Sequence, residues 1–262
     1  MVGIKESTYK TLLIGLFLIS LIGCKNSPTQ DDESFIFVGR NAYFEDNING
    51  VTFLRDNETR KPLNGYYVVG NETSKWEEFN VKEGVLEGDY IIFHDNGEIF
   101  SHSQYKRGKL HGEEKINYKS GKLKTLKTFT NGTPYGITKT FFESGQLQIE
   151  SKLKDGEIVE STAYNIVGEI IAQSFEKDGR TIRQSIKSGK VYKEEISSNY
   201  DNFEAVKFFD DEGKMTMFIR MYEEGEDRFF IELDENENEI NRVNLKKDPH
   251  QIIKYRKYFE QH

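Results

Sequence analysis

Apolar and polar side chains alternate along the middle of the chain, in short segments separated by clusters of turn-forming residues. The clusters include HDNGE, YKSGK and FESGQ, each built around one glycine. After each cluster, apolar residues recur at an even separation, which places both members of a pair on one face of a β-strand. The three pairs are Ile99 and Tyr105, Leu123 and Phe129, and Leu147 and Leu153. The pattern predicts strands with one apolar and one wet face.

Glycine recurs through this region on a fixed schedule. Successive glycines are separated by intervals of four, nine and eleven, and the cycle then repeats with a 24-residue period. Glycine has no Cβ and supplies the positive φ that tight hairpin turns require, so we interpret the whole set as structural turn glycines and expect positive φ at the turn tips. The set is Gly84, Gly88, Gly97, Gly108, Gly112, Gly121, Gly132, Gly136, Gly145 and Gly156.

The predicted fold is all-β. Each 24-residue unit predicts one β-hairpin, and such hairpins side by side form an elongated antiparallel meander in which each unit needs its neighbour to bury its apolar face. The composition agrees, because 19 Phe and 14 Tyr accompany only four Pro and one Trp. The repeats weaken after Gly156, but we expect strands from about Phe35 to about Val243.

A short C-terminal α-helix is predicted for residues 248–262. Asp248 is expected to be its N-cap and Pro249 its first residue. Ile252, Tyr255 and Phe259 follow at helical spacing and predict that the helix caps the sheet or covers one face. The β-repeat domain then occupies residues 35–247.

The N-terminus predicts a lipoprotein signal peptide over residues 1–23. Leu12 to Gly23 carry no charge and are too few to span a bilayer as a helix. The segment ends in LIGC, which resembles the bacterial lipobox. That resemblance implies a diacylglyceryl and palmitoyl-type modification of Cys24, the single cysteine of the chain, with residues 24–34 as a flexible, partly acidic linker.

The glycine pattern resembles the variant MORN repeats of bacterial proteins grouped as the YwqK-type antitoxin family. The clear resemblance covers Val51 to Gly156 and includes an upstream unit with the stretch KPLNG. The resemblance implies a hairpin-repeat fold and, for antitoxins, a protein that binds and neutralises a toxic partner. Fold alone does not carry that function. The residues that carry the resemblance, besides the glycines from Gly97 to Gly145, are Tyr105, Leu110, His111, Tyr118, Leu123, Phe129, Tyr135 and Phe142.

The sequence contains no arrangement typical of catalysis. It has no G-x-S-x-G, HExxH or P-loop motif, so we expect no enzyme and no cofactor. His94 and His111 could meet around a metal, but no carboxylate recurs with them at ligand spacing. The stretch DENENEI imitates a calcium loop, yet Glu239 replaces the required glycine and Leu245 the bidentate glutamate, so we expect a hairpin turn there and no metal.

Charge is distributed unevenly along the chain. Residues 104–127 contain eight Lys or Arg against two Glu, and residues 199–240 contain fourteen Asp or Glu against four Lys or Arg. Such segments can steer a charged partner or simply form a solvated strand face. A net charge of −8 argues against nucleic acid. The candidate partner-binding residues, assigned to the wet face and the hairpin tips, are Arg107, Lys109, Lys124 and Lys127.

Taken together, these features predict a membrane-tethered, non-catalytic repeat protein that acts as a protein-binding or scaffold module, with an antitoxin or immunity role as the narrower version. The expected location is the bacterial cell envelope, at the outer membrane or cell surface rather than the inner membrane. The alternatives are a structural or glycan-binding envelope lipoprotein and a hydrolase whose site no motif reveals. The ligand and the oligomeric state do not follow from the sequence.

Overall fold

The computed structural model of the protein describes residues 35–48, 51–198 and 200–259. The described residues form strands, two 3-10 helices and one α-helix. The helices are η1 (Arg40–Ala42), η2 (Pro249–Ile252) and α1 (Ile253–Phe259). The strands are β1 (Ile36–Val38), β2 (Tyr43–Ile48), β3 (Val51–Asp56), β4 (Gly65–Gly70), β5 (Lys75–Lys82), β6 (Val85–Phe93), β7 (Ile99–Lys106), β8 (Lys109–Asn117), β9 (Leu123–Thr130), β10 (Thr133–Phe141), β11 (Leu147–Lys154), β12 (Glu157–Tyr164), β13 (Ile170–Lys177), β14 (Arg180–Lys187), β15 (Lys190–Ser198), β16 (Glu204–Phe209), β17 (Met215–Glu224), β18 (Asp227–Leu233) and β19 (Glu239–Asn244).

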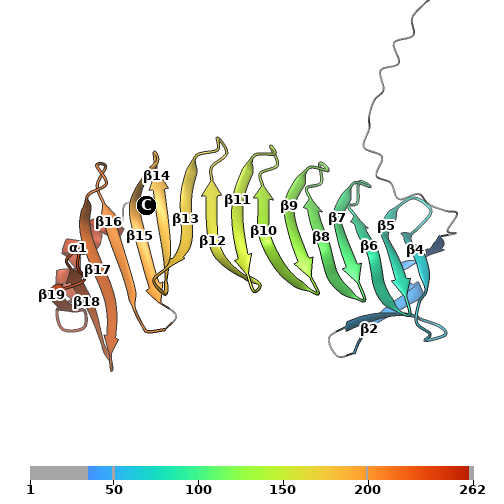
Figure 1. Cartoon of the computed structure of the whole chain (residues 1–262), viewed down its shortest axis with the longest axis horizontal. Helices are drawn as coiled ribbons and strands as arrows, with labels where there is room; N and C mark the ends of the chain where they lie inside the picture. The colour runs from blue at the N-terminus through green and yellow to red at the C-terminus, as the bar shows by residue number, and fades with distance from the viewer. Residues whose placement is uncertain (1–34, 49–50, 199, 260–262) are drawn as a thin grey trace, which may run out of the picture. The chain divides into compact units, whose positions relative to one another are not determined.

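One long antiparallel sheet contains almost all of these strands. From β4 to β19 every strand pairs antiparallel with the next strand in sequence, and β1 adds to β4 in parallel. β2 and β3 form a separate hairpin. The strands therefore follow one another along the sheet in chain order (Figure 1). The predicted all-β meander of hairpins with a short C-terminal helix is confirmed.

Two kinds of turn alternate along the sheet. On one edge, loops such as 94–98 close with a hydrogen bond from the Gly97 N–H to the His94 carbonyl at 3.0 Å, with glycine at positive φ. On the other edge, two-residue turns such as Arg107–Gly108 have both residues at positive φ, 51° and 73°, which is the type I′ geometry. The expected positive φ is found at Gly121 (78°) and Gly145 (98°).

Three glycines of the predicted turn set lie inside strands and not in turns. Gly88, Gly112 and Gly136 belong to β6, β8 and β10 and have φ of 81°, 115° and 74°. Each lies where the register shifts against the preceding strand. A strand with extra residues must bend its backbone there, and glycine adopts the required positive φ without a Cβ clash. The glycine schedule thus contains two turn glycines and one bulge glycine per repeat.

The strand register separates two faces of the sheet. Face 1 includes Ser103 and Ser151, and the latter is paired with Ser161 on β12. Face 2 includes Lys139 and Glu150, which are cross-strand partners and form an ion pair at 3.2 Å.

The prediction that each apolar pair lies on one face is wrong, because the register shifts just after the first member and moves that residue to face 2. The second members, Tyr105, Phe129 and Leu153, lie on face 1, whose centre is occupied by hydroxyl side chains.

The β2–β3 hairpin covers face 1 at the N-terminal end of the sheet. Leu54 of β3 is buried against Val69 and Phe79 of the sheet. The hydroxyl groups of Tyr43 and Tyr90 both donate to the Glu77 carboxylate, at 3.2 and 2.7 Å. A half-buried carboxylate thus joins the hairpin to β5 and β6.

The C-terminal helix covers face 1 at the other end. Tyr255 of α1 is fully buried against Ile219 and Val243. Its hydroxyl donates to Glu232 at 3.3 Å, and Lys254 Nζ approaches the same carboxylate at 3.1 Å. The predicted cover of one sheet face by this helix is confirmed for the described residues.

The start of this helix differs from the prediction. Asp248 stands at the N-cap, but its side chain makes no capping hydrogen bond. The Gln251 N–H instead donates to the Asp248 carbonyl at 3.0 Å, the i to i+3 bond of a 3-10 turn, so that N–H is not available to the carboxylate. Ile252, expected on the packed side, is exposed because it belongs to this tighter first turn.

Candidate functional site

Between its two covered ends the sheet is a single layer. The buried apolar clusters of the described residues consist of side chains from 54–81 and from 196–255. In the segment between them, Phe129 is the buried apolar side chain, accompanied by the buried serines Ser101, Ser103 and Ser151. The middle hairpins therefore hold together by strand pairing and half-buried side chains, and both of their faces reach solvent.

Large apolar side chains are exposed on these middle hairpins. Ile137 and Ile158 are 51% and 62% exposed. Their partners across the ladder are Lys152 and Leu153, which are adjacent in β11, so the two isoleucines lie on opposite faces. Apolar exposure on contiguous strands is typical of an interaction surface. The exposed set on β10 to β13 is Tyr135, Ile137, Ile149, Ile158, Ile166, Val167, Ile170 and Ile171.

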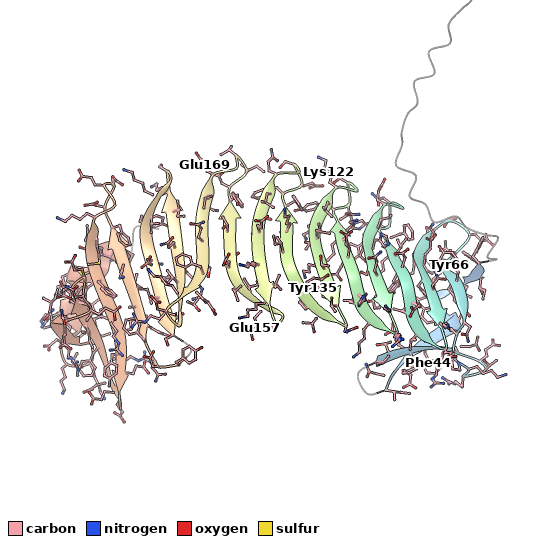
Figure 2. The ribbon with its side chains drawn as sticks, in the orientation of Figure 1. Phe44, Tyr66, Lys122, Tyr135, Glu157 and Glu169 are labelled. Atoms are coloured by element: carbon pink, nitrogen blue, oxygen red, sulfur yellow. The ribbon has the colours of Figure 1, made fainter. Side chains whose placement is uncertain are left out.

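The four candidate partner-binding residues do not form one surface. Arg107 and Lys109 lie at the β7–β8 turn, whereas Lys124 follows the β8–β9 turn at the opposite edge of the sheet. The nine residues of β8 separate the two turns by ~30 Å. Figure 2 shows the two edges, with Lys122 and Glu169 along the upper one and Glu157 along the lower.

The assignment of Lys127 to the wet face is wrong. Lys127 lies two residues from the buried Phe129 and pairs with Glu114, while Phe129 pairs with Gly112. An even separation within one strand places both side chains on the same face. Lys127 therefore projects from face 1, half-buried, and cannot act together with Lys124 or Lys109.

Among the described residues, five of the fourteen carboxylates of the acidic segment pair with cations from outside it. Glu237 forms a hydrogen-bonded pair with Arg180, at 2.6 Å between Oε1 and Nη1, and this contact holds the pKa of Glu237 below its usual value. Cations from beyond β18 pair with four further carboxylates. These pairs are Glu226 with Lys246, Asp227 with Lys247, Glu232 with Lys254, and Glu239 with Arg242.

The basic segment keeps more of its charge unpaired. Lys115 pairs with Glu113 and Lys119 with Asp95. Within the described part of the chain, no ion pair is found for the six other cations of the segment. These are Lys106, Arg107, Lys109, Lys122, Lys124 and Lys127. Counted over the described residues, the basic segment therefore keeps the larger share of its charges out of ion pairs, six of eight cations against eight of fourteen carboxylates in the acidic segment.

The histidines do not converge on a metal. His94 Nε2 lies 3.2 Å from the Asn117 carbonyl oxygen, and His102 Nε2 lies 2.8 Å from Asp89 Oδ1. His111 lies in β8, and its Nδ1 is buried without a hydrogen-bond partner. Among the described residues, no group of three His, Cys, Asp or Glu could hold a metal ion.

The calcium-like stretch forms the β18–β19 turn, as expected. Asp234 Oδ1 accepts hydrogen bonds from the N–H groups of Asn236 and Asn238, at 2.9 and 2.8 Å. These bonds, together with the side-chain bond from Asn238, lower the pKa of Asp234. The carboxylate therefore serves the turn itself.

The predicted signal peptide, Cys24 and the linker lie outside the described residues. None of the helices in the described ranges is long and apolar enough to cross a membrane. Lipid attachment at Cys24 therefore stays a prediction.

The fold and its surface define a hairpin-repeat protein built on one antiparallel sheet. Three consecutive stretches of the chain, 86–107, 110–131 and 134–155, match the MORN repeat variant. Each stretch is one hairpin, β6–β7, β8–β9 or β10–β11, which confirms the resemblance at the level of the repeat. No curated protein matches the chain. Membership of the YwqK-type antitoxin family and the lipoprotein form stay predictions.

Proposed function

We propose that the chain is a membrane-tethered, non-catalytic repeat protein that binds another protein across its middle hairpins. The observation that carries the proposal is the single-layer segment between the two covered ends, with large apolar side chains exposed on β10 to β13. A partner that covers these side chains removes apolar surface from water, and this burial favours binding.

The charged residues beside this apolar surface indicate the chemistry of the partner. The unpaired cations of β7 to β9 lie next to the apolar strands, whereas the acidic segment lies at the far end of the sheet, where cations from outside it pair with five of its carboxylates. A partner with an apolar contact surface and an acidic border fits this arrangement. An antitoxin or immunity role is the specific form of this proposal, with the lipid on Cys24 holding the complex at the cell envelope.

The test is capture of a partner by the full chain from detergent-solubilised membranes. Ile137→Asp and Ile158→Asp each place a charge on one face, and Ile240→Asp is the matched control because Ile240 is equally exposed, at 63%, but lies on β19. We expect one of the first two variants to lose a stoichiometric partner that Ile240→Asp retains.

The variant that fails to capture the partner identifies the sheet face that binds it. Exposed positions tolerate such changes within roughly 0.5 kcal/mol of stability, so loss of capture reports contact and not unfolding. If both middle variants capture the same partner as the unchanged chain does, or if no stoichiometric partner is found, the proposal is refuted.

A further inference from the structure

A cavity of about 530 Å³ at the β7–β8 turn is lined by three cationic side chains of that turn and by one residue of a neighbouring turn. Its walls are Lys106, Arg107, Lys109 and His111, with Asn131 from the β9–β10 turn. No carboxylate is among these lining residues. The Glu87 carboxylate accepts a hydrogen bond from the Arg107 backbone N–H at 2.7 Å.

The strand register brings like charges directly opposite each other. Lys106 and Lys109 are cross-strand partners on the two sides of the Arg107–Gly108 turn. Like charges in this position destabilise a hairpin. Neither lysine forms an ion pair with any described residue, and the buried Nδ1 of His111, two residues further along β8, has no hydrogen-bond partner. The turn therefore concentrates positive charge and donor groups that the protein itself does not satisfy.

The repeat supplies an internal comparison for these positions. One repeat further along the chain, the equivalents of Lys106, Lys109 and His111 are uncharged. They are Thr130, Thr133 and Tyr135, and in the preceding repeat the residues are Lys82, Val85 and Glu87. Thr130 pairs with Thr133, and Lys82 with Val85, in the same register as Lys106 with Lys109.

The hairpin thus forms without the cationic cluster. The two-residue turn with positive φ is retained in all three repeats, so the fold needs the glycine and not the charges. A second cavity, beside the similar Ser188–Gly189 turn, shows the usual balance, because Asp210 and Asp211 line it together with its lysines.

We propose that the cavity at the β7–β8 turn is a binding site for an oxyanion of the phosphate type. A tetrahedral dianion presents oxygen atoms in several directions at once, so it can accept hydrogen bonds from both strands and from the adjacent turn. Charge-assisted bonds from Lys and Arg to phosphate oxygens are the strong class of such contacts. The bound anion removes the repulsion between Lys106 and Lys109. This site is separate from the apolar surface proposed above and does not depend on it.

The test is titration of the full chain, in detergent at low ionic strength, with inorganic phosphate. Backbone amide signals of residues 106–111 are followed by NMR, and sodium chloride at matched ionic strength is the control. We expect saturable shifts with phosphate that chloride does not reproduce. The variants Lys109→Thr and His111→Tyr introduce the residues of the next repeat, so both should fold, and each should weaken phosphate binding about tenfold.

Lys124→Ala is the matched control, because Lys124 belongs to the same basic segment but lies at the other edge of the sheet. Its affinity for phosphate should equal that of the unchanged chain. Phosphate shifts that chloride reproduces, or undiminished binding by Lys109→Thr and His111→Tyr, would overturn the proposal.

A second arm separates the two sources of the phosphate group. Flotation with phosphatidylcholine vesicles, with and without phosphatidylglycerol, is compared between the unchanged chain and His111→Tyr, since any anchor contributes equally to both. If phosphatidylglycerol increases vesicle binding of the unchanged chain but not of His111→Tyr, and free phosphate abolishes this increase, the ligand is a lipid headgroup. Phosphate binding without that gain identifies a soluble phosphate compound. Both results support the site.

Discussion

Replacing Gly145 with valine tests whether the turn geometry of the repeats is correct. Gly145 closes the β10–β11 turn with φ of 98°, and its N–H donates to the Phe142 carbonyl at 2.8 Å. A Cβ at this position would meet no atom within 4 Å. The expected loss therefore comes from the backbone alone, because a β-branched residue at positive φ is strained by about 1 to 3 kcal/mol.

The assay is thermal unfolding followed by circular dichroism. For a domain of this size each kcal/mol lowers Tm by about 2 to 4 °C. Gly39→Val is the matched control, because Gly39 has an extended backbone with φ of −79° and the same open surroundings. Gly121→Val should lose at least as much as Gly145→Val, since its Cβ would also lie 2.8 Å from Glu98 Oε2. If Gly145→Val has the same Tm as the unchanged chain, the positive φ assigned to Gly145 is wrong.

Two further predictions concern the N-terminal end of the sheet and the anchor. Burial, followed by the hydrogen bond to Glu77, raises the pKa of the Tyr90 phenol above its ordinary 10.0. Above pH 10 the folded chain then retains a proton that the unfolded chain has lost, so stability should fall with rising pH, by at most about 1.4 kcal/mol per pH unit for this group. Urea unfolding between pH 9 and 11 should show a shallower decline for Tyr90→Phe than for Tyr135→Phe; equal slopes would contradict this. Separately, Cys24→Ala should move the protein from the membrane fraction to the soluble fraction. A cleaved Cys24→Ala protein that stays in the membrane fraction would refute the lipid anchor.

The repeated hairpins could be predicted from sequence because their determinants are local. Glycine spacing fixes the turns, and the alternation of side chains indicates strands, within each single repeat. Alternation does not reveal the register shift that places the first member of each apolar pair on the opposite face from the second, as it does Ile99 and Tyr105. The strand limits, from Ile36 to Asn244, are close to the expected ones. Local signals do not distinguish a turn glycine from a bulge glycine, which is why the glycine schedule alone assigns Gly112 to a turn.

The hairpin that covers the N-terminal end of the sheet, and the individual contacts at both covered ends, could not be predicted, because these contacts are distant in sequence. Tyr43 reaches Glu77 across 34 residues, and Tyr255 reaches Glu232 across 23. Neither contact has a sequence pattern of its own. The same holds for the cavity at the β7–β8 turn, because one of its lining residues, Asn131, belongs to the β9–β10 turn. A position-by-position comparison of the repeats would have singled out His111 and Lys109, since their equivalents are neither cationic nor histidine.

The comparison of the repeats also shows that Lys127 occupies a position where the neighbouring repeats have a buried serine. Its equivalents in the neighbouring repeats are Ser103 and Ser151, both buried on face 1. Since the fold accepts a small hydroxyl side chain there twice, it does not require a lysine, and the cross-strand partner Glu114 is likewise a departure from its repeat equivalents. The departures on face 1 and those at the β7–β8 turn fall in the same hairpin, β8–β9 and the turn before it. Identical hairpins suffice to build the sheet, so the residues that distinguish this hairpin from its neighbours are those free to serve binding.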